Sequence, residues 1–220
     1  MTYAFNNVRS IVKYTGGGRF LTEFGRCRPD GNPDSINTVE CNAVMNAADN
    51  NFESWTHWDD YELFPNLYIS NFSLKSISRT YPQSTAGQPV ELRFDVDSGV
   101  FYYAFVPTQE YCTNVNSALL VAEIFVPMSI HYPYGVKTRF RPEQLYYKIY
   151  ENNTNLMFVY APCTLINNNI EQMEITIKPK QTQDEHSDNN YTHLPTYSKS
   201  ISILLIVNAV IFSHFSTYFV

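Results

Sequence analysis

The chain has 220 residues with 15 basic and 21 acidic side chains, which gives a formal net charge of −6. It has no cluster of lysine and arginine that would neutralise phosphates, so we do not expect nucleic acid as a partner. The 44% hydrophobic and 15% aromatic content is enough for one or two domains with a buried core.

The N-terminal segment predicts a helix that ends near Tyr14, and residues 1–9 lack the apolar run of a signal peptide. Gly16, Gly17 and Gly18 follow, but no Gly-Lys-Ser/Thr completes a phosphate-binding loop. We expect these glycines to end the helix and to lead into a short apolar strand over residues 19–25.

Glu23 stands near the end of that strand, directly before Phe24 and Gly25. In a (β/α)8 barrel, the carboxyl ends of the strands open onto the mouth where active sites lie. The position suits the nucleophilic carboxylate of a retaining glycosidase. The alternative is a glutamate that caps a helix or forms a salt bridge.

Helical and strand patterns alternate up to about residue 80. We expect a helix over 35–50, a strand over 52–61 and a helical stretch to about residue 78, before strand patterns take over. This order predicts an α/β plus all-β chain. Residues 1–80 would form the C-terminal part of a (β/α)8 TIM barrel, with its last two strands and helices, and residues 81–180 a β-sandwich domain.

The start of the predicted β-domain is a hairpin, because two alternating runs, 90–94 and 100–105, flank an Asp/Ser/Gly turn at 95–99. A calcium loop is disfavoured, since an EF-hand needs glycine at position six and glutamate at position twelve, where this chain has Val100 and Val106. Seven or so short strands in all would fit a β-sandwich. We expect the further strands over 122–126, 137–140, 145–150, 156–160 and 172–179.

The role of this β-domain is either carbohydrate binding or packing against the barrel. The sequence favours packing, because no exposed aromatic triad can be identified in it. Most of the 17 tyrosines and 15 phenylalanines are expected in the core and in cross-strand pairs. We expect His131 to be a hydrogen-bonded structural residue.

Together these motifs resemble the C-terminal region of endoglycoceramidases, which are retaining glycoside hydrolases of the family-five type. The resemblance covers roughly residues 3–180, and its motifs occur in the order of that family. They are 22–25, 54–58, 81–89, 94–101, and 123–127 with 131–135.

The resemblance implies that Glu23 is the nucleophile and that the substrate is a glycosphingolipid, cut between its oligosaccharide and its ceramide. Trp58 is the best candidate for the sugar platform. Trp55 is the second candidate for substrate binding, although it tends toward the other face of its strand, where it would be core. Asp59 and Asp60 would bind sugar hydroxyls or, as we prefer, cap the next helix. No metal or other cofactor is expected.

The acid/base of that family lies in an Asn-Glu-Pro sequence on the fourth barrel strand, and this chain contains no Asn-Glu pair. We therefore expect the chain to be part of a longer hydrolase and to be inactive by itself. The alternative is a non-catalytic, membrane-anchored protein whose β-domain binds glycan or lipid.

Four cysteines, Cys27, Cys41, Cys112 and Cys163, allow three disulfide connectivities and have no zinc-site spacing. Because two lie around one early loop and two in the β-region, we expect Cys27–Cys41 and Cys112–Cys163. Three glycosylation sequons agree with an oxidising secretory route. They start at Asn71, Asn152 and Asn190.

The C-terminal tail, 201–220, carries no acidic or basic side chain and follows a polar linker at 181–200. A spanning helix needs about 20 predominantly apolar residues, and this tail is a marginal one. A glycosylphosphatidylinositol-anchor signal is favoured, with a tail anchor and a misread terminus as alternatives. The expected location is extracellular or at the cell surface, with attachment to the membrane.

Overall fold

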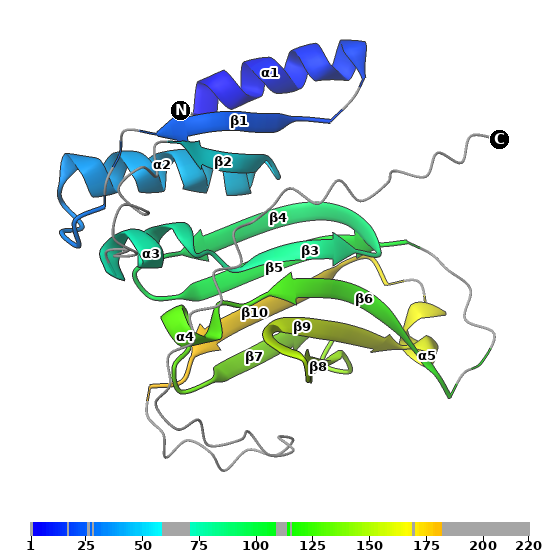
Figure 1. The fold of residues 1–220 in the computed structure, drawn as a ribbon. Coiled ribbons are helices and arrows are strands. Elements are labelled where there is room, and N and C mark those ends of the chain that lie inside the picture. Colours follow the sequence, from blue (N-terminus) through cyan, green and yellow to red (C-terminus); the bar gives the residue numbers. More distant parts are fainter. Residues whose placement is uncertain are drawn as a thin grey trace. The chain divides into compact units, whose positions relative to one another are not determined.

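The structure is a computed structural model that describes residues 2–16, 18–25, 27, 29–58, 71–108, 114, 116–168 and 170–181. The predicted tail and all of the predicted linker after Gln181 lie outside these residues, as do Asp59, Asp60, Cys112 and Asn190. The described elements appear in Figure 1. In chain order they are α1 (Thr2–Thr15), β1 (Phe20–Gly25), α2 (Ile36–Asn50), β2 (Ser54–Trp58), α3 (Asn71–Ile77), β3 (Tyr81–Thr85), β4 (Gly87–Asp95), β5 (Val100–Pro107), β6 (Ala118–Phe125), α4 (Met128–His131), β7 (Val136–Arg141), β8 (Tyr146–Tyr150), β9 (Asn153–Pro162), α5 (Cys163–Ile166) and β10 (Met173–Pro179).

The first strands, β1 and β2, pair in parallel and are connected through α2. Parallel strands need such a crossover, because a tight turn reverses the chain direction. Helix α2 begins where the sequence predicts, since the side chain of its N-cap Ser35 accepts a hydrogen bond from the Thr38 backbone N–H at 3.2 Å. Strand β2 begins at Ser54, two residues later than the predicted strand over 52–61, and it is described as far as Trp58; residues 59–61 lie outside the described part.

The later strands form two four-stranded antiparallel sheets, β4-β5-β10-β7 and β3-β6-β9-β8. The predicted hairpin is confirmed, because β4 and β5 pair from Gly87 opposite Pro107 to Asp95 opposite Val100. The Asp95 carboxylate accepts hydrogen bonds from the backbone N–H groups of Asp97 and Ser98, at 2.9 and 3.2 Å. These bonds and the left-handed φ of 67° at Gly99 close the turn.

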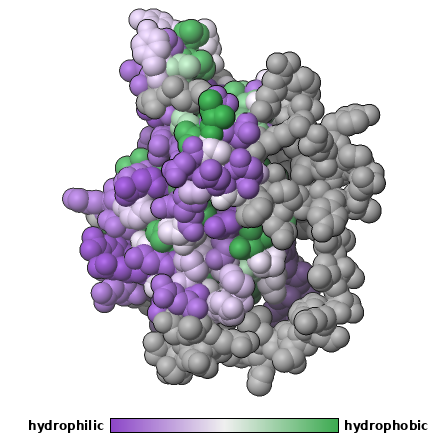
Figure 2. Space-filling model, turned by 90° about the vertical axis from the view of Figure 1, so that its left-hand side faces the viewer, coloured by the Kyte–Doolittle hydropathy of each residue, from purple (hydrophilic) through white to green (hydrophobic). Residues whose placement is uncertain are grey.

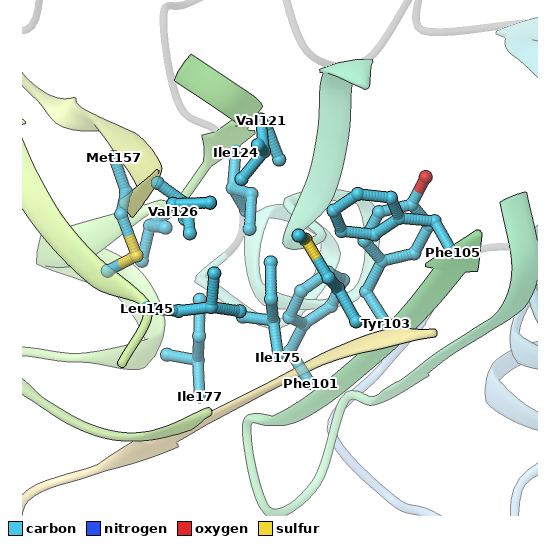
Figure 3. Packing of buried hydrophobic residues seen from close by; sticks show 14 of the residues in the cluster. Phe101, Tyr103, Phe105, Val121, Ile124, Val126, Leu145, Met157, Ile175 and Ile177 are labelled. Atoms are coloured by element: carbon cyan, nitrogen blue, oxygen red, sulfur yellow. The ribbon is translucent and has the colours of Figure 1, made fainter. Parts of the chain in front are cut away.

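The two sheets share one hydrophobic core, to which alternate residues of their strands contribute (Figure 3). Burial of each large apolar side chain stabilises the fold by about 1.5–3 kcal/mol. The Tyr103 hydroxyl, inside this core, lies 2.7 Å from the hydroxyl of Thr85 on the other sheet, so its polar atom is satisfied. Core residues seen in Figure 3 include Phe101, Tyr103, Phe105, Val121, Ile124, Val126, Leu145, Met157, Ile175 and Ile177.

Some elements differ from the sequence-based expectation. Strand β6 begins at Ala118, four residues earlier than predicted, and the one-turn helices α4 and α5 were not predicted. Strand β3 was also missed, since Pro82 and the polar residues after it obscure the pattern. Proline is tolerated there because β3 is an edge strand.

The end of α2 contacts the β-region through Arg79, which is almost fully buried. Its guanidinium bonds the Asp49 carboxylate at 2.8 Å, the Asn46 side-chain oxygen at 2.5 Å and the Phe94 carbonyl at 3.0 Å. Phe52, in the turn between α2 and β2, packs against the core of the two sheets. These contacts join α2 to the β-region; the role of the β-domain in packing against a barrel stays a prediction.

The surface shown in Figure 2 is mostly hydrophilic, and its hydrophobic residues lie in small separate groups. Among the described residues, no helix combines the length and the apolar character needed to cross a membrane.

Candidate functional site

Glu23 lies in a β-bulge near the C-terminal end of β1. Leu21 pairs with Trp55 and Phe24 pairs with His57, so three steps along β1 correspond to two along β2. Without the extra residue, Leu21 and Phe24 would point to opposite faces of the pair. With it, both contact the apolar clusters under α2, while Thr22 and Glu23 are both exposed.

The bulge is held by a side-chain hydrogen bond as well as by packing. The Thr56 hydroxyl donates to the Thr22 carbonyl, directly before Glu23. Bulges often stand beside active sites, where they redirect a side chain. The arrangement thus presents the Glu23 carboxylate to solvent from a fixed backbone.

An aromatic cluster lies on the helix-facing side of the strand pair. The Phe24 ring meets the Trp55 ring edge-on at 5.4 Å and the His57 ring at 5.2 Å. Trp55 is half-buried and packs in the clusters that contain Ala48 and Met45 of α2. It therefore contributes to packing, as the sequence analysis expected of a core residue; its part in substrate binding stays a prediction.

The expected disulfide Cys27–Cys41 is confirmed, and it ties the segment after β1 to α2. His57 lies beside it, with Nε2 3.9 Å from the Cys27 sulfur. The sulfurs and a nitrogen of His57 lie within 4.8 Å of one another, a spacing that three metal ligands can have. Both sulfurs are consumed in the disulfide, however, and metals bind the thiolate form.

The opposite end of the strand pair is fixed by an ion pair between a partly buried arginine and a buried glutamate. Arg19, directly before β1, lies 2.9 Å from the Glu53 carboxylate, directly before β2, and also donates to the Asn51 carbonyl at 2.7 Å. Sequence reasoning did not single out these residues. They hold the starts of both strands, at the end remote from Glu23.

The remaining predicted site residues are placed as follows. Trp58 is the last residue of β2, opposite Gly25 in the register; its side chain lies outside the described part. Asn152 is exposed in the β8–β9 turn, whereas the side chain of Asn71 is not described. The Cys112–Cys163 pairing involves a residue outside the described ones and stays a prediction.

His131 has the structural role that the sequence predicted. Its ring is buried, and Nε2 donates to the carbonyls of Ser78 and Lys75, at 2.7 and 3.0 Å. Burial lowers the pKa of His131 below its usual 6.5, and the nearby positive charges of Lys75 and Arg79 lower it further. The two hydrogen bonds act in the opposite direction and raise it.

One set of side chains was not singled out by the sequence analysis, which identified no exposed aromatic triad in the β-domain. The outer face of the β3-β6-β9-β8 sheet carries six aromatic rings, of which those of Tyr146 and Tyr150 are 40% and 41% exposed. The signal available in the sequence was alternation, with Tyr146, Lys148 and Tyr150 on one strand and Phe158 and Tyr160 on the next.

Comparison with known proteins finds similarity in this region. Residues 79–186, from the buried Arg79 through all of β3–β10, match the family model of the Glycoside hydrolase family 5 C-terminal domain. The resemblance found in the sequence is thereby confirmed: the chain is similar to the C-terminal portion of endoglycoceramidase-like hydrolases. Endoglycoceramidase I of Rhodococcus hoagii (strain 103S) is 33% identical over 132 residues, which are 60% of this chain and 23% of that protein.

Two solved structures share the fold. Endo-glycoceramidase II from Rhodococcus sp., in a complex with a five-membered iminocyclitol, is 15% identical with a TM-score of 0.55, over 80% of this chain and 36% of that one. Cryptococcus neoformans sterylglucosidase 1 is 16% identical with a TM-score of 0.57, over 82% and 32%. The chain thus spans about a quarter to a third of the length of these proteins.

Proposed function

We propose that this chain supplies the nucleophile and the C-terminal β-domain of an endoglycoceramidase-like hydrolase, which cuts glycosphingolipids between oligosaccharide and ceramide with retention of configuration. The observation that carries the proposal is the exposed Glu23 in the bulge of β1, in a chain whose following residues match a glycoside hydrolase family.

In the proposed reaction, the Glu23 carboxylate attacks the anomeric carbon, and the bond from that carbon to the ceramide oxygen breaks. The leaving oxygen takes a proton from a second carboxyl group, about 5–5.5 Å from the first. Water, deprotonated by the same group, then cleaves the glycosyl ester and regenerates Glu23. Because the chain has no Asn-Glu pair, we assign the second carboxyl group to a polypeptide segment outside this chain.

The fold supports a chain that holds the nucleophile in one part and a β-domain in the other. We propose that residues 1–80 are the last two strand–helix units of a TIM barrel and that residues 81–180 are a β-sandwich. The parallel β1–β2 pair with α2 between them has the connectivity of such units. Trp58, at the C-terminal end of the strand next to Glu23's, would offer the platform for the sugar next to the cleaved bond.

The location proposed for the protein is the cell surface, with attachment to the membrane through the C-terminal tail or a lipid anchor. The Cys27–Cys41 disulfide supports an oxidising compartment. The second candidate is a non-catalytic glycan- or lipid-binding protein. The aromatic outer face of the β3-β6-β9-β8 sheet favours glycan binding within that alternative.

Hydrolysis of lactosylceramide by protein purified from its own cells, with an antibody to residues 83–180, tests the proposal. Glu23→Gln removes the nucleophile without changing side-chain size, and we expect at least about a thousandfold loss of oligosaccharide release. The matched control is Glu40→Gln, on the exposed side of α2, which should leave the rate unchanged. Equal rates for Glu23→Gln and the native protein would sink the nucleophile assignment.

A further inference from the structure

The outer side of the β3-β6-β9-β8 sheet carries what we call the aromatic face. Each of its four strands contributes at least one ring, and all six rings lie on the side of the sheet opposite the hydrophobic core. The aromatic face consists of Tyr81, Phe125, Tyr146, Tyr150, Phe158 and Tyr160.

The rings are in contact with one another in three pairs. Tyr146 and Tyr160 stack with centroids 5.5 Å apart and planes 17° apart. Tyr150 and Phe158 lie 5.5 Å apart, and Tyr81 and Phe125 lie 5.3 Å apart. Neighbouring strands thus hold the rings in a fixed arrangement, which spares the entropy of ordering loose side chains when a ligand binds.

The aromatic face is close to electrically neutral. Lys148 and Glu123 lie on either side of Phe158 in one cross-strand row, and the Lys148 ammonium stands 5.6 Å from the centroid of the Tyr160 ring. One cation and one anion balance each other, so the face offers hydrogen-bonding groups without a net charge.

These features fit a neutral sugar. A pyranose ring has a face of C–H groups, which packs on the negative face of an aromatic ring, and hydroxyl groups around its edge. The Tyr, Lys and Glu side chains can donate to or accept from those hydroxyls. The Tyr150 hydroxyl already accepts a hydrogen bond from Asn152 at 3.3 Å, so its own proton can point outward.

A membrane surface fits less well. Peripheral proteins bind anionic lipid through clusters of lysine and arginine or insert amphipathic helices into the interface. Here a single lysine is balanced by a glutamate, and the rings lie along the strands of a sheet, packed against one another.

We infer that the aromatic face is a binding site for a neutral oligosaccharide, separate from the site of Glu23. Such a site would hold the glycan part of a substrate or a neighbouring glycan near the protein. The inference goes beyond the proposed hydrolysis and does not depend on Glu23, so a failed hydrolysis test leaves it standing.

Saturation-transfer NMR with lactose tests the inference on the full chain, after enzymatic removal of any glycan from Asn152, which stands beside Tyr150. Saturation of the aromatic protons should pass to the lactose ring protons, with affinity in about the millimolar range. The paired change Tyr146→Ser and Tyr160→Ser should weaken binding about tenfold or more. The matched control, Tyr102→Ser on the outer face of the other sheet, should leave binding unchanged.

A chemical measurement needs no variant and so does not depend on how the changed protein folds. Nitration of tyrosines, mapped by mass spectrometry, should be slowed by lactose at Tyr146 and Tyr150. It should proceed unchanged at Tyr134, which is 46% exposed elsewhere on the chain. Absence of both transfer and protection, or transfer that survives the paired change, would overturn the inference. Loss of binding to phosphatidylcholine vesicles in the paired variant, without any lactose binding, would assign the face to a membrane instead.

Discussion

Glu23 is exposed because of the bulge in β1, which depends on how β1 pairs with β2. A strand could be predicted from the apolar residues around it, because that pattern is local. The bulge could not, since it depends on how Leu21 and Phe24 pair with Trp55 and His57, some 30 residues away. Exposure of the carboxylate is therefore a result of strand pairing that the sequence pattern alone does not contain.

His131 gives the protein a predictable sensitivity to acid. Its folded-state pKa is lowered by burial, whereas in the unfolded chain the ring binds a proton as the pH falls below about 6.5. The unfolded state then carries more protons, so the free energy of unfolding should fall as the pH drops through that value. We expect His131→Gln, which keeps a hydrogen-bond donor, to lose less stability between pH 7.5 and 5.5.

Urea unfolding at the two pH values measures this difference. The variant and the native protein should be unfolded in the same buffers at both pH values. Other groups also titrate in this range, and their contribution is common to the two proteins. If the variant and the native protein lost the same free energy of unfolding, the assignment of acid sensitivity to His131 would be wrong.

At the scale of elements, local signals predicted local structure. Ser35 marked the start of α2, and the residues around Gly99 marked the β4–β5 turn, because a cap and a turn each depend on a few consecutive residues. The strand order could not be predicted, since β10 pairs with β5 and β7 across long stretches of chain. For the same reason the aromatic face was missed: its rings meet only when β8, β9, β6 and β3 are neighbours.

The disulfide between the segment after β1 and α2 should stabilise this pair of elements. Its cysteines are 14 residues apart, and closing a loop of that length is worth about 3 kcal/mol. We expect the paired change Cys27→Ala and Cys41→Ala to lower the free energy of unfolding by about 2–4 kcal/mol. Denaturant unfolding followed by tryptophan fluorescence measures this loss, because Trp55 packs against the cluster that contains Cys27 and Cys41. A loss well under about 1 kcal/mol would mean that packing alone holds the segment.

At the scale of the whole molecule, one buried arginine connects the α/β elements before residue 80 with the sheets after it. Arg79 bonds Asp49 of α2 and the carbonyl of Phe94 on β4, and it lies over the Phe94 ring at 5.1 Å. Sequence analysis placed a boundary near this residue from the change of pattern. It did not predict the contact, because Asp49 and Arg79 are separated by 30 residues.

Arg79→Met should leave the Asp49 carboxylate buried without its partner. We expect a loss of about 3–5 kcal/mol in the free energy of unfolding, measured by denaturant titration. The matched control is Arg93→Met, which breaks an exposed pair with Glu91 on the same strand and should cost less than about 1 kcal/mol. Equal effects of the two changes would contradict a joining role for Arg79.

If Glu23 is the nucleophile of a retaining hydrolase, it forms a glycosyl ester with the substrate, and this ester can be trapped. Protein isolated from its own cells would be incubated with an activated 2-deoxy-2-fluoro lactoside, digested and analysed by mass spectrometry. We predict a fluorolactosyl group on the peptide that contains Glu23, and on no other peptide. A label on a different residue, or no label in a preparation that hydrolyses lactosylceramide, would contradict it.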